Sequence, residues 1–167
     1  QASSALGMDK LAFGAAMSAA GLPTLPRTLV ATGGESAPDF EGPFIAKPRF
    51  GGSSIGIEVA EDWETVLALK RSSSFFDQGA VVEPFLGGSR DLQVGVRTYP
   101  AFEMSAVEAP ARADDGIYSY DQKYLAWGGE VSGGRELPAE MSAEVAASLG
   151  EGGHAVVQAG DEQAVLE

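Results

Sequence analysis

The sequence predicts an α+β fold in which helices are interspersed with antiparallel hairpins. Three observations support this class. Apolar residues recur at the three- and four-residue spacing of helices at 8–20, 61–72 and 138–149. Short apolar segments bounded by turn residues predict strands at 27–31, 80–86, 92–96, 101–107, 155–158 and 163–166. The 22 glycines indicate many turns between these elements.

Composition and charge limit the classes of function. With 44% hydrophobic and 21% charged residues, the 167-residue chain is globular and can form one domain or two small lobes. A net charge of −13 argues against nucleic acid as a partner, because such binding requires a basic face. No apolar run approaches the ~20 residues of a membrane span, and no secretory signal is visible, so we expect no membrane partner. The absence of cysteine excludes disulfides and thiolate chemistry.

The three helices are predicted from their ends as well as from their spacing. The first carries Lys10 in its first turn and is followed by Gly21, a residue type common after helix C-termini. The second has Glu61 and Asp62 in its first turn and basic residues in its last turn, which suits the helix dipole. The third is expected to stop at Gly150.

The segments between the helices differ in character. Pro84 has no backbone N–H, so the strand 80–86 must end there or lie at a sheet edge. Residues 32–43 are polar and rich in turn formers, which predicts a loop without obvious chemistry. The predicted loop 110–135 contains a dense tyrosine-rich motif, 118–124. The single histidine, His154, has no partner at a spacing that indicates catalysis or metal binding, so we interpret it as structural.

The most informative stretch is 44–58, which predicts a strand ending at Lys47, a turn rich in glycine and serine, and a second strand. Small residues let backbone N–H groups approach a phosphate closely, and hydroxyl and ammonium groups add donors. The order differs from that of a P-loop, in which the lysine follows the glycines. From these residues alone, a phosphate-covering loop and a plain tight hairpin both remain open.

Other polar residues stand where they would suit a nucleotide, each with a plainer alternative. Lys10 is a cation at a helix N-terminus, which indicates either an anionic ligand or a solvated surface lysine. Glu83 could accept from an adenine amino group while the Leu86 N–H serves a ring nitrogen, or it could lie exposed at a strand end. Asp91 could accept from ribose hydroxyls or bond its own turn. The tyrosine-rich loop could close over phosphates or pack on itself.

The order and spacing of these motifs resemble those of the ATP-grasp domain of D-alanine–D-alanine ligases. Five motifs in the family's order carry the resemblance, at 4–10, 19–23, 45–56, 82–86 and 120–124. The fit is looser over 126–150. The resemblance implies an α+β ATP-grasp fold with two lobes, antiparallel sheets, flanking helices and the nucleotide between the lobes. It also implies that 24–88 form the smaller nucleotide-binding lobe and that the remainder is part of the larger catalytic lobe.

The resemblance implies ATP and Mg²⁺ as cofactors and D-alanine as substrate. It implies an ATP-dependent ligase that forms an acyl phosphate, acts in the cytoplasm in peptidoglycan precursor synthesis, and is compatible with a homodimer. Lys123 is implied to reach the γ-phosphate, while Ser53 and Tyr124 help to close the loops over the site, so these three are the implied catalytic residues. The implied nucleotide contacts come from Lys10, Lys47, Gly52, Ser53, Ser54, Glu83, Phe85, Leu86, Asp91 and Lys123.

The sequence also departs from the family. The Arg-x-Asp motif is missing at 156–158, and Glu167 alone stands where a Glu-x-Asn motif would begin, so the metal ligands are not identified. Asp91 follows a Ser-Arg insertion, which leaves its register open. Because the family's N-terminal domain is also missing, we expect a fragment that lacks the full catalytic set. Two alternatives remain: another ATP-grasp carboxylate–amine ligase, or a non-catalytic ATP-binding module.

Overall fold

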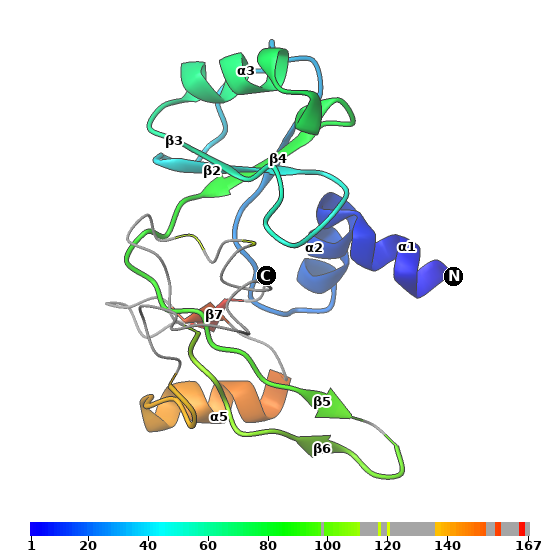
Figure 1. The fold of residues 1–167 in the computed structure, drawn as a ribbon, viewed down its shortest axis with the longest axis vertical. Helices are drawn as coiled ribbons and strands as arrows, with labels where there is room; N and C mark the ends of the chain where they lie inside the picture. The colour runs from blue at the N-terminus through cyan, green and yellow to red at the C-terminus, as the bar shows by residue number, and fades with distance from the viewer. Residues whose placement is uncertain are drawn as a thin grey trace. The chain divides into compact units, whose positions relative to one another are not determined.

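A computed structural model describes residues 1–97, 99–110, 117, 120, 136–152, 156–157 and 164–165 (Figure 1). The chain divides into two compact units. The first comprises Gln1–Gly21 and Leu25–Phe85, and the second comprises Leu22–Thr24 and Leu86–Glu167. Within the described part of the chain, no helix has the length and apolar character needed to cross a membrane.

The first unit begins with two helices where the sequence predicted one. Helix α1 covers Ala2–Met8 and helix α2 covers Lys10–Ala19. Asp9 separates them because it is extended, with φ −95° and ψ 99°, and its carboxylate accepts hydrogen bonds from two N–H groups of the first turn of α2. The predicted helix at 8–20 therefore starts two residues too early, and α1 was not predicted. Gly21 has a left-handed φ of 76°, as expected after a helix C-terminus.

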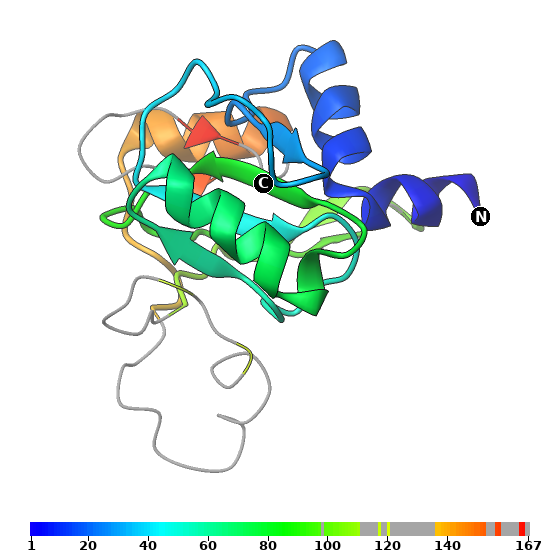
Figure 2. The ribbon, with the colours of Figure 1, turned by 90° about the horizontal axis from the view of Figure 1, so that it is seen from above.

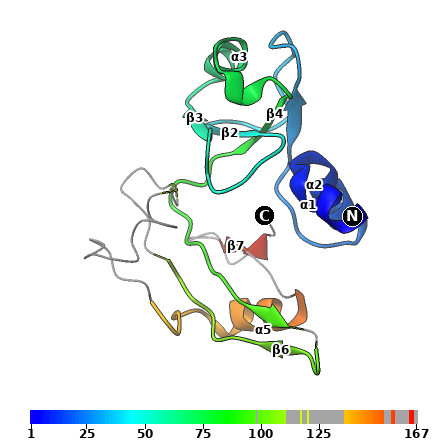
Figure 3. The same ribbon diagram turned by 45° about the vertical axis from the view of Figure 1, so that its right-hand side comes forward.

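The centre of the first unit is a four-stranded antiparallel sheet with the strand order β1-β4-β2-β3. The strands are β1 (Thr28–Val30), β2 (Phe44–Pro48), β3 (Glu58–Ala60) and β4 (Ala80–Pro84). Strand β4 ends at Pro84, which confirms one of the two predicted outcomes for that proline. The β2–β3 connection, 49–57, extends from the side of the sheet opposite helix α3, as Figures 1 and 3 show.

Helix α3 (Trp63–Ser72) covers one face of this sheet (Figure 2). It starts two residues later than the predicted 61, because the Asp62 carboxylate caps it by accepting from the Thr65 N–H, so Glu61 and Asp62 precede its first turn. Lys70 and Arg71 lie in its last turn, as the sequence predicted. The core under α3 contains alternate residues of the strands together with helix residues and the short 3-10 helix η1 (Ser74–Phe76): Val30, Phe44, Ala46, Ala60, Val66, Phe76, Ala80 and Val82. Because neighbouring strand residues point to opposite faces, Lys47 and Glu83 lie on the face away from α3.

In its described residues, the second unit contains two short hairpins and the helix α5. Strands β5 (Val96–Arg97) and β6 (Glu103–Met104) pair antiparallel, as do β7 (Val156–Val157) and β8 (Ala164–Val165). Helix α5 runs from Ala143 to Gly152. Its residues Val145 and Leu149 form a small core with Leu92, Ala109 and Ala139.

Three predictions for the second unit need correction. The helix predicted from Pro138 begins at Ala143, because the Ser142 hydroxyl accepts from the Val145 N–H at 3.2 Å and sets the helix start. Gly150 does not stop it, and the helix continues to Gly152. The strands predicted at 92–96 and 101–107 are reduced to β5 and β6 plus a bridge between Gln93 and Glu108. The two C-terminal strands are confirmed within their predicted ranges.

Candidate functional site

The sheet face away from α3 carries a buried ion-pair cluster centred on Glu83. Glu83 pairs in register with Ile45 of β2, so Lys47, two residues further along β2, lies on the same face as Glu83. The Lys47 Nζ atom is 2.9 Å from Glu83 Oε2, and the Arg27 Nη2 atom is 3.1 Å from Glu83 Oε1. Glu83 is 2% exposed. A carboxylate this deeply buried requires compensating cations, and the cluster supplies two.

Sequence reasoning missed Arg27. It directly precedes β1, and Thr28 pairs with Val82, so Arg27 reaches the position beside Glu83. Its Nη1 atom also donates to the backbone carbonyl of Lys10 at 2.9 Å. A Cβ atom on Gly14 would lie 2.2 Å from that nitrogen, so the guanidinium passes over α2 where a side chain is absent. Glu83 in the apolar strand 80–84 could have indicated such a residue, because a buried carboxylate requires a cation from a neighbouring strand.

One oxygen of Glu83 has unused acceptor capacity. Glu83 Oε2 is buried, and no donor among the described residues makes a well-aligned hydrogen bond to it. The 2.9 Å separation from Lys47 therefore defines an ion pair whose geometry is outside that of a hydrogen bond. A carboxylate oxygen has two lone pairs, so Oε2 keeps acceptor capacity beyond its ion pair with Lys47.

Lys10 connects α2 to the β2–β3 loop. Its ammonium donates to the carbonyls of Pro48 and Gly51, at 2.9 Å each. An ammonium has three donors, so these two contacts account for two of them. Burial lowers the pKa of Lys10 below its ordinary value, and the positive charge of Lys47 lowers it further. The two lysines are therefore close enough for their charges to interact.

The loop itself holds an uncommon backbone conformation. Ser53 and Ser54 have left-handed φ angles of 59° and 58°, which non-glycine residues rarely adopt. The Ile55 N–H donates to the Gly52 carbonyl at 3.2 Å and closes the turn. Gly56 also has a positive φ, and a Cβ atom there would lie 2.6 Å from the Phe75 side chain. Strained backbone of this kind occurs frequently at ligand-binding loops.

The charges in this cluster do not balance. Among the described residues, the positive charges of Lys10, Lys47, Arg27 and Arg49 number four, against the two carboxylates of Glu83 and Asp9, in a chain whose net charge is −13. Like charges that lower each other's pKa are stabilised by an anion placed between them. The arrangement therefore favours an anionic ligand at the junction of α2, β2 and the loop.

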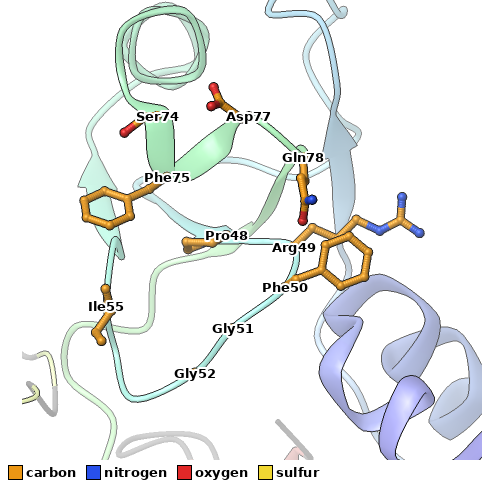
Figure 4. A pocket seen from close by; sticks show the side chains of 10 residues that line it. All are labelled: Pro48, Arg49, Phe50, Gly51, Gly52, Ile55, Ser74, Phe75, Asp77 and Gln78. Atoms are coloured by element: carbon orange, nitrogen blue, oxygen red, sulfur yellow. The ribbon is translucent and has the colours of Figure 1, made fainter.

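A pocket of about 460 Å³ borders the same loop (Figure 4). The rings of Phe50 and Phe75 and the side chain of Ile55 lie around it, and η1 and the residues after it add Ser74, Asp77 and Gln78. Gly52 is the single predicted site residue in its lining. The pocket therefore does not coincide with the cationic cluster, and we assign it no nucleotide.

The remaining predicted site residues lie elsewhere. Phe85, half-buried, follows β4, and its N–H donates to the Pro43 carbonyl at 2.7 Å. Leu86 and Asp91 belong to the second unit, where the Leu86 carbonyl accepts from Ser89 at 3.0 Å (backbone N) and 2.7 Å (Oγ). Lys123, Tyr124 and His154 lie outside the described residues. Within the described ranges, no group of three or more His, Asp or Glu residues could hold a metal ion.

Comparisons with solved structures define the class of fold. D-Alanine–D-alanine ligase from Helicobacter pylori matches with a TM-score of 0.62 and 21% identity, over 95% of this chain and 53% of that protein. D-Alanyl-alanine synthetase A from Vibrio cholerae matches with a TM-score of 0.74 and 14% identity, over 98% and 54%. VanG D-Ala:D-Ser ligase from Enterococcus faecalis matches with a TM-score of 0.66 and 22% identity, over 89% and 43%. The predicted α+β ATP-grasp fold is thus confirmed.

Sequence comparison then gives the family. The family model described as "D-ala D-ala ligase C-terminus" matches residues 18–159, and the chain belongs to this family. The D-alanine–D-alanine ligase of Corynebacterium aurimucosum is 32% identical over 157 residues, which are 87% of this chain and 42% of that protein. The ligase of Campylobacter concisus is 35% identical over 117 residues, 69% of this chain and 32% of that protein. The chain thus spans less than half the length of these curated relatives.

Proposed function

We propose that the protein containing this sequence is an ATP-dependent ligase that joins two D-alanine molecules. We further propose that the first unit holds the phosphates of ATP. The observation that carries the proposal is the cationic cluster at the β2–β3 loop, where Lys47 pairs with the buried Glu83 and its positive charge lowers the pKa of Lys10. Family membership and the names of the relatives support the reaction class.

The reaction we propose has two steps. The carboxylate of one D-alanine attacks the γ-phosphorus of ATP, forming an acyl phosphate and ADP. The amine of a second D-alanine then attacks the acyl carbon, loses a proton and displaces phosphate. In both steps negative charge develops on phosphoryl oxygens, and preorganised cations in a site that excludes water stabilise it.

In this proposal each residue of the first unit has a defined task. Lys10 donates its third N–H to a phosphate oxygen, while the two loop carbonyls hold its ammonium in place. Lys47 contributes the second positive charge. The turn formed by Gly52, Ser53 and Ser54 covers the triphosphate with backbone N–H and hydroxyl donors. Glu83 Oε2, buried and without a well-aligned hydrogen bond, accepts from the adenine amino group.

The other predicted contacts complete the nucleotide site. We propose that Phe85 packs near the adenine, that the Leu86 N–H bonds a ring nitrogen, and that Asp91 accepts from the ribose hydroxyls. Lys123 and Tyr124 are proposed to reach the γ-phosphate and to close over it together with Ser53. ATP-grasp ligases use Mg²⁺ to neutralise phosphate charge, and we expect it here, with ligands outside the groups identified above.

A calorimetric titration of the chain with Mg-ATP tests the nucleotide site. We expect Lys47→Gln to weaken binding by about tenfold or more, because a charge-assisted hydrogen bond to phosphate contributes roughly 1.5–3 kcal/mol. Lys70→Gln, which removes the same charge from the last turn of α3, is the matched control. Equal affinities of the two variants would contradict the phosphate assignment.

The reaction requires a separate test. The full-length protein is assayed for phosphate release with ATP and D-alanine, with D-serine as a competing second substrate. Release that depends on D-alanine alone supports the proposed activity. Preference for D-serine, which the fold shared with a D-Ala:D-Ser ligase makes worth testing, would change the substrate assignment. ATP binding without any release would instead support a non-catalytic nucleotide-binding module.

A further inference from the structure

Asp9 forms two sets of contacts that join α2 to the β2–β3 loop. Its Oδ1 atom accepts from the N–H groups of Leu11 and Ala12, at 3.1 and 3.3 Å, and so caps α2. Its two oxygens also accept from the Arg49 guanidinium, with Nε at 3.0 and 3.1 Å and Nη2 at 2.6 Å from Oδ2. This is a bidentate pair, the geometry that fixes both partners most firmly. The Asp9 side chain is 12% exposed and that of Arg49 is 30% exposed, so the pair is partly shielded from water.

Arg49 is the first residue of the loop, and its backbone is held on both sides. The Lys10 N–H donates to the Arg49 carbonyl at 3.0 Å, and the Arg49 N–H donates to the Gly79 carbonyl at 3.0 Å. Asp9 and Phe50 form an isolated β-bridge. The Arg49 Cζ atom lies 5.1 Å from the centroid of the Phe50 ring, so a ring contact adds to the ion pair (Figure 4).

The same segment carries the two carbonyls that hold the Lys10 ammonium. Those carbonyls belong to Pro48 and Gly51, on either side of Arg49 and Phe50. The direction of the ammonium therefore depends on where Arg49 holds the chain. The turn with the two left-handed serines begins directly after this segment.

We propose that Asp9 is a positioning residue for nucleotide binding: through its bidentate pair with Arg49 it fixes the segment 48–51, where β2 leads into the loop, and thereby orients the Lys10 ammonium. This inference rests on the proposed function, because Lys10 is taken as a phosphate contact. Asp9 itself touches no phosphate. The Asp9 carboxylate would repel a phosphate, so Asp9 contributes to binding only by positioning Arg49 and Lys10.

A competing assignment for Arg49 makes the opposite prediction. If Arg49 were itself the phosphate ligand, Asp9 would compete with the nucleotide for the guanidinium, and removing the Asp9 charge would tighten binding. If Asp9 positions the loop, removing the charge weakens binding. The sign of the change therefore separates the two assignments.

The test uses Asp9→Asn in the full chain, with Mg-AMP-PNP as the titrated probe. Asparagine retains the helix cap but loses the charged bidentate pair. We expect the Kd to rise about fivefold or more. Asp62→Asn is the matched control, because Asp62 also caps a helix of this unit with its carboxylate, and it should leave the Kd unchanged. Arg49→Gln should weaken binding similarly, and the double variant should be no worse than either single variant.

A second readout tests the loop without any ligand. Amide exchange of Lys10, which donates to Arg49, and of Ile55, which closes the serine turn, is compared between wild type and variants. Both amides should exchange several-fold faster in Asp9→Asn and at the wild-type rate in Asp62→Asn. Unchanged exchange, or tighter nucleotide binding, overturns the positioning role. If wild type fails to bind AMP-PNP but the exchange result holds, the proposed function is overturned. The structural role of the bidentate pair between Asp9 and Arg49 then still stands.

Discussion

Replacing Glu83 by glutamine removes the carboxylate on which two buried cations depend. The Glu83 side chain is 3% exposed, and those of Arg27 and Lys47 are 12% and 11% exposed. Glutamine has nearly the same shape but no charge, so the variant leaves two positive charges close together with little access to water. Breaking a buried ion pair in this manner costs about 3–5 kcal/mol. The first unit, Gln1–Gly21 and Leu25–Phe85, has the size of a domain of about 60–100 residues, for which this loss corresponds to a decrease in Tm of at least ~12 °C.

Thermal unfolding followed by circular dichroism at pH 7 measures this effect. Glu58→Gln is the matched control, because Glu58 lies exposed on β3 of the same sheet. A triple variant with leucine at 83 and methionine at 27 and 47 separates charge from packing. It should recover most of the lost stability, since apolar replacement of a complete buried ion-pair cluster is often neutral or stabilising. It should nevertheless fail to bind Mg-ATP.

Melting temperatures of Glu83→Gln and Glu58→Gln within about 2 °C of each other would contradict a role for Glu83 in stabilising the buried cations. That result would mean that the cations do not need Glu83, and that the cluster is less buried or less paired than its geometry indicates. A triple variant that bound Mg-ATP with wild-type affinity would refute the assignment of Lys47 to the phosphates, whatever its stability.

Three further predictions follow from single contacts. Gly14→Ala should destabilise the first unit despite the better helix propensity of alanine, because its Cβ would displace the Arg27 guanidinium; a Tm above wild type would contradict this. Hydrogen bonds from backbone N–H groups, foremost that of Thr32, lower the pKa of Glu35 to about 2, so its stabilisation is present above pH ~4.5 and lost as the pH falls toward 2. Between pH ~4.5 and 2 the free energy of unfolding of wild type should therefore fall by about 1–2 kcal/mol more than that of Glu35→Gln, after allowance for solvent screening. Acid denaturation measures this difference, and parallel pH dependences of the two proteins would refute the contacts of Glu35. Burial and the charge of Lys47 lower the pKa of Lys10, and a bound phosphate should raise it again, so Mg-ATP binding at alkaline pH should take up protons. Calorimetry in buffers of different ionisation enthalpy detects this uptake, and Lys10→Met should abolish it.

Much of the first unit could be predicted because its signals are local. The short apolar runs at 44–48 and 80–84 predict two strands, and Pro84 marks the end of its strand. The acidic start and basic end of α3 follow from the helix dipole. The glycine- and serine-rich turn was also predicted, although the left-handed φ of its two serines was not, because propensity assigns that conformation to glycine.

What the sequence did not reveal depends on contacts between distant residues. The pairing of Arg27 with Glu83 requires the register between β1 and β4, which no local pattern contains. Asp9 was included in a motif but given no task, because its partner Arg49 is 40 residues away. Segment 32–43 was expected to lack chemistry, yet it holds the carboxylate of Glu35 on four backbone N–H groups. In α5, the Ser142 cap decided the helix start against the earlier Pro138.

We propose above that nucleotide phosphates bind between Lys10 and Lys47 on the sheet face away from α3. NMR of carbon-13-labelled lysine side chains during titration with Mg-AMP-PNP tests it most directly, with Lys70 of α3 as an internal reference. We expect the side-chain resonances of Lys10 and Lys47 to shift together as the site fills, the pKa of Lys10 to rise, and the resonances of Lys70 to stay unchanged. Saturable binding that leaves Lys10 and Lys47 unperturbed would contradict it.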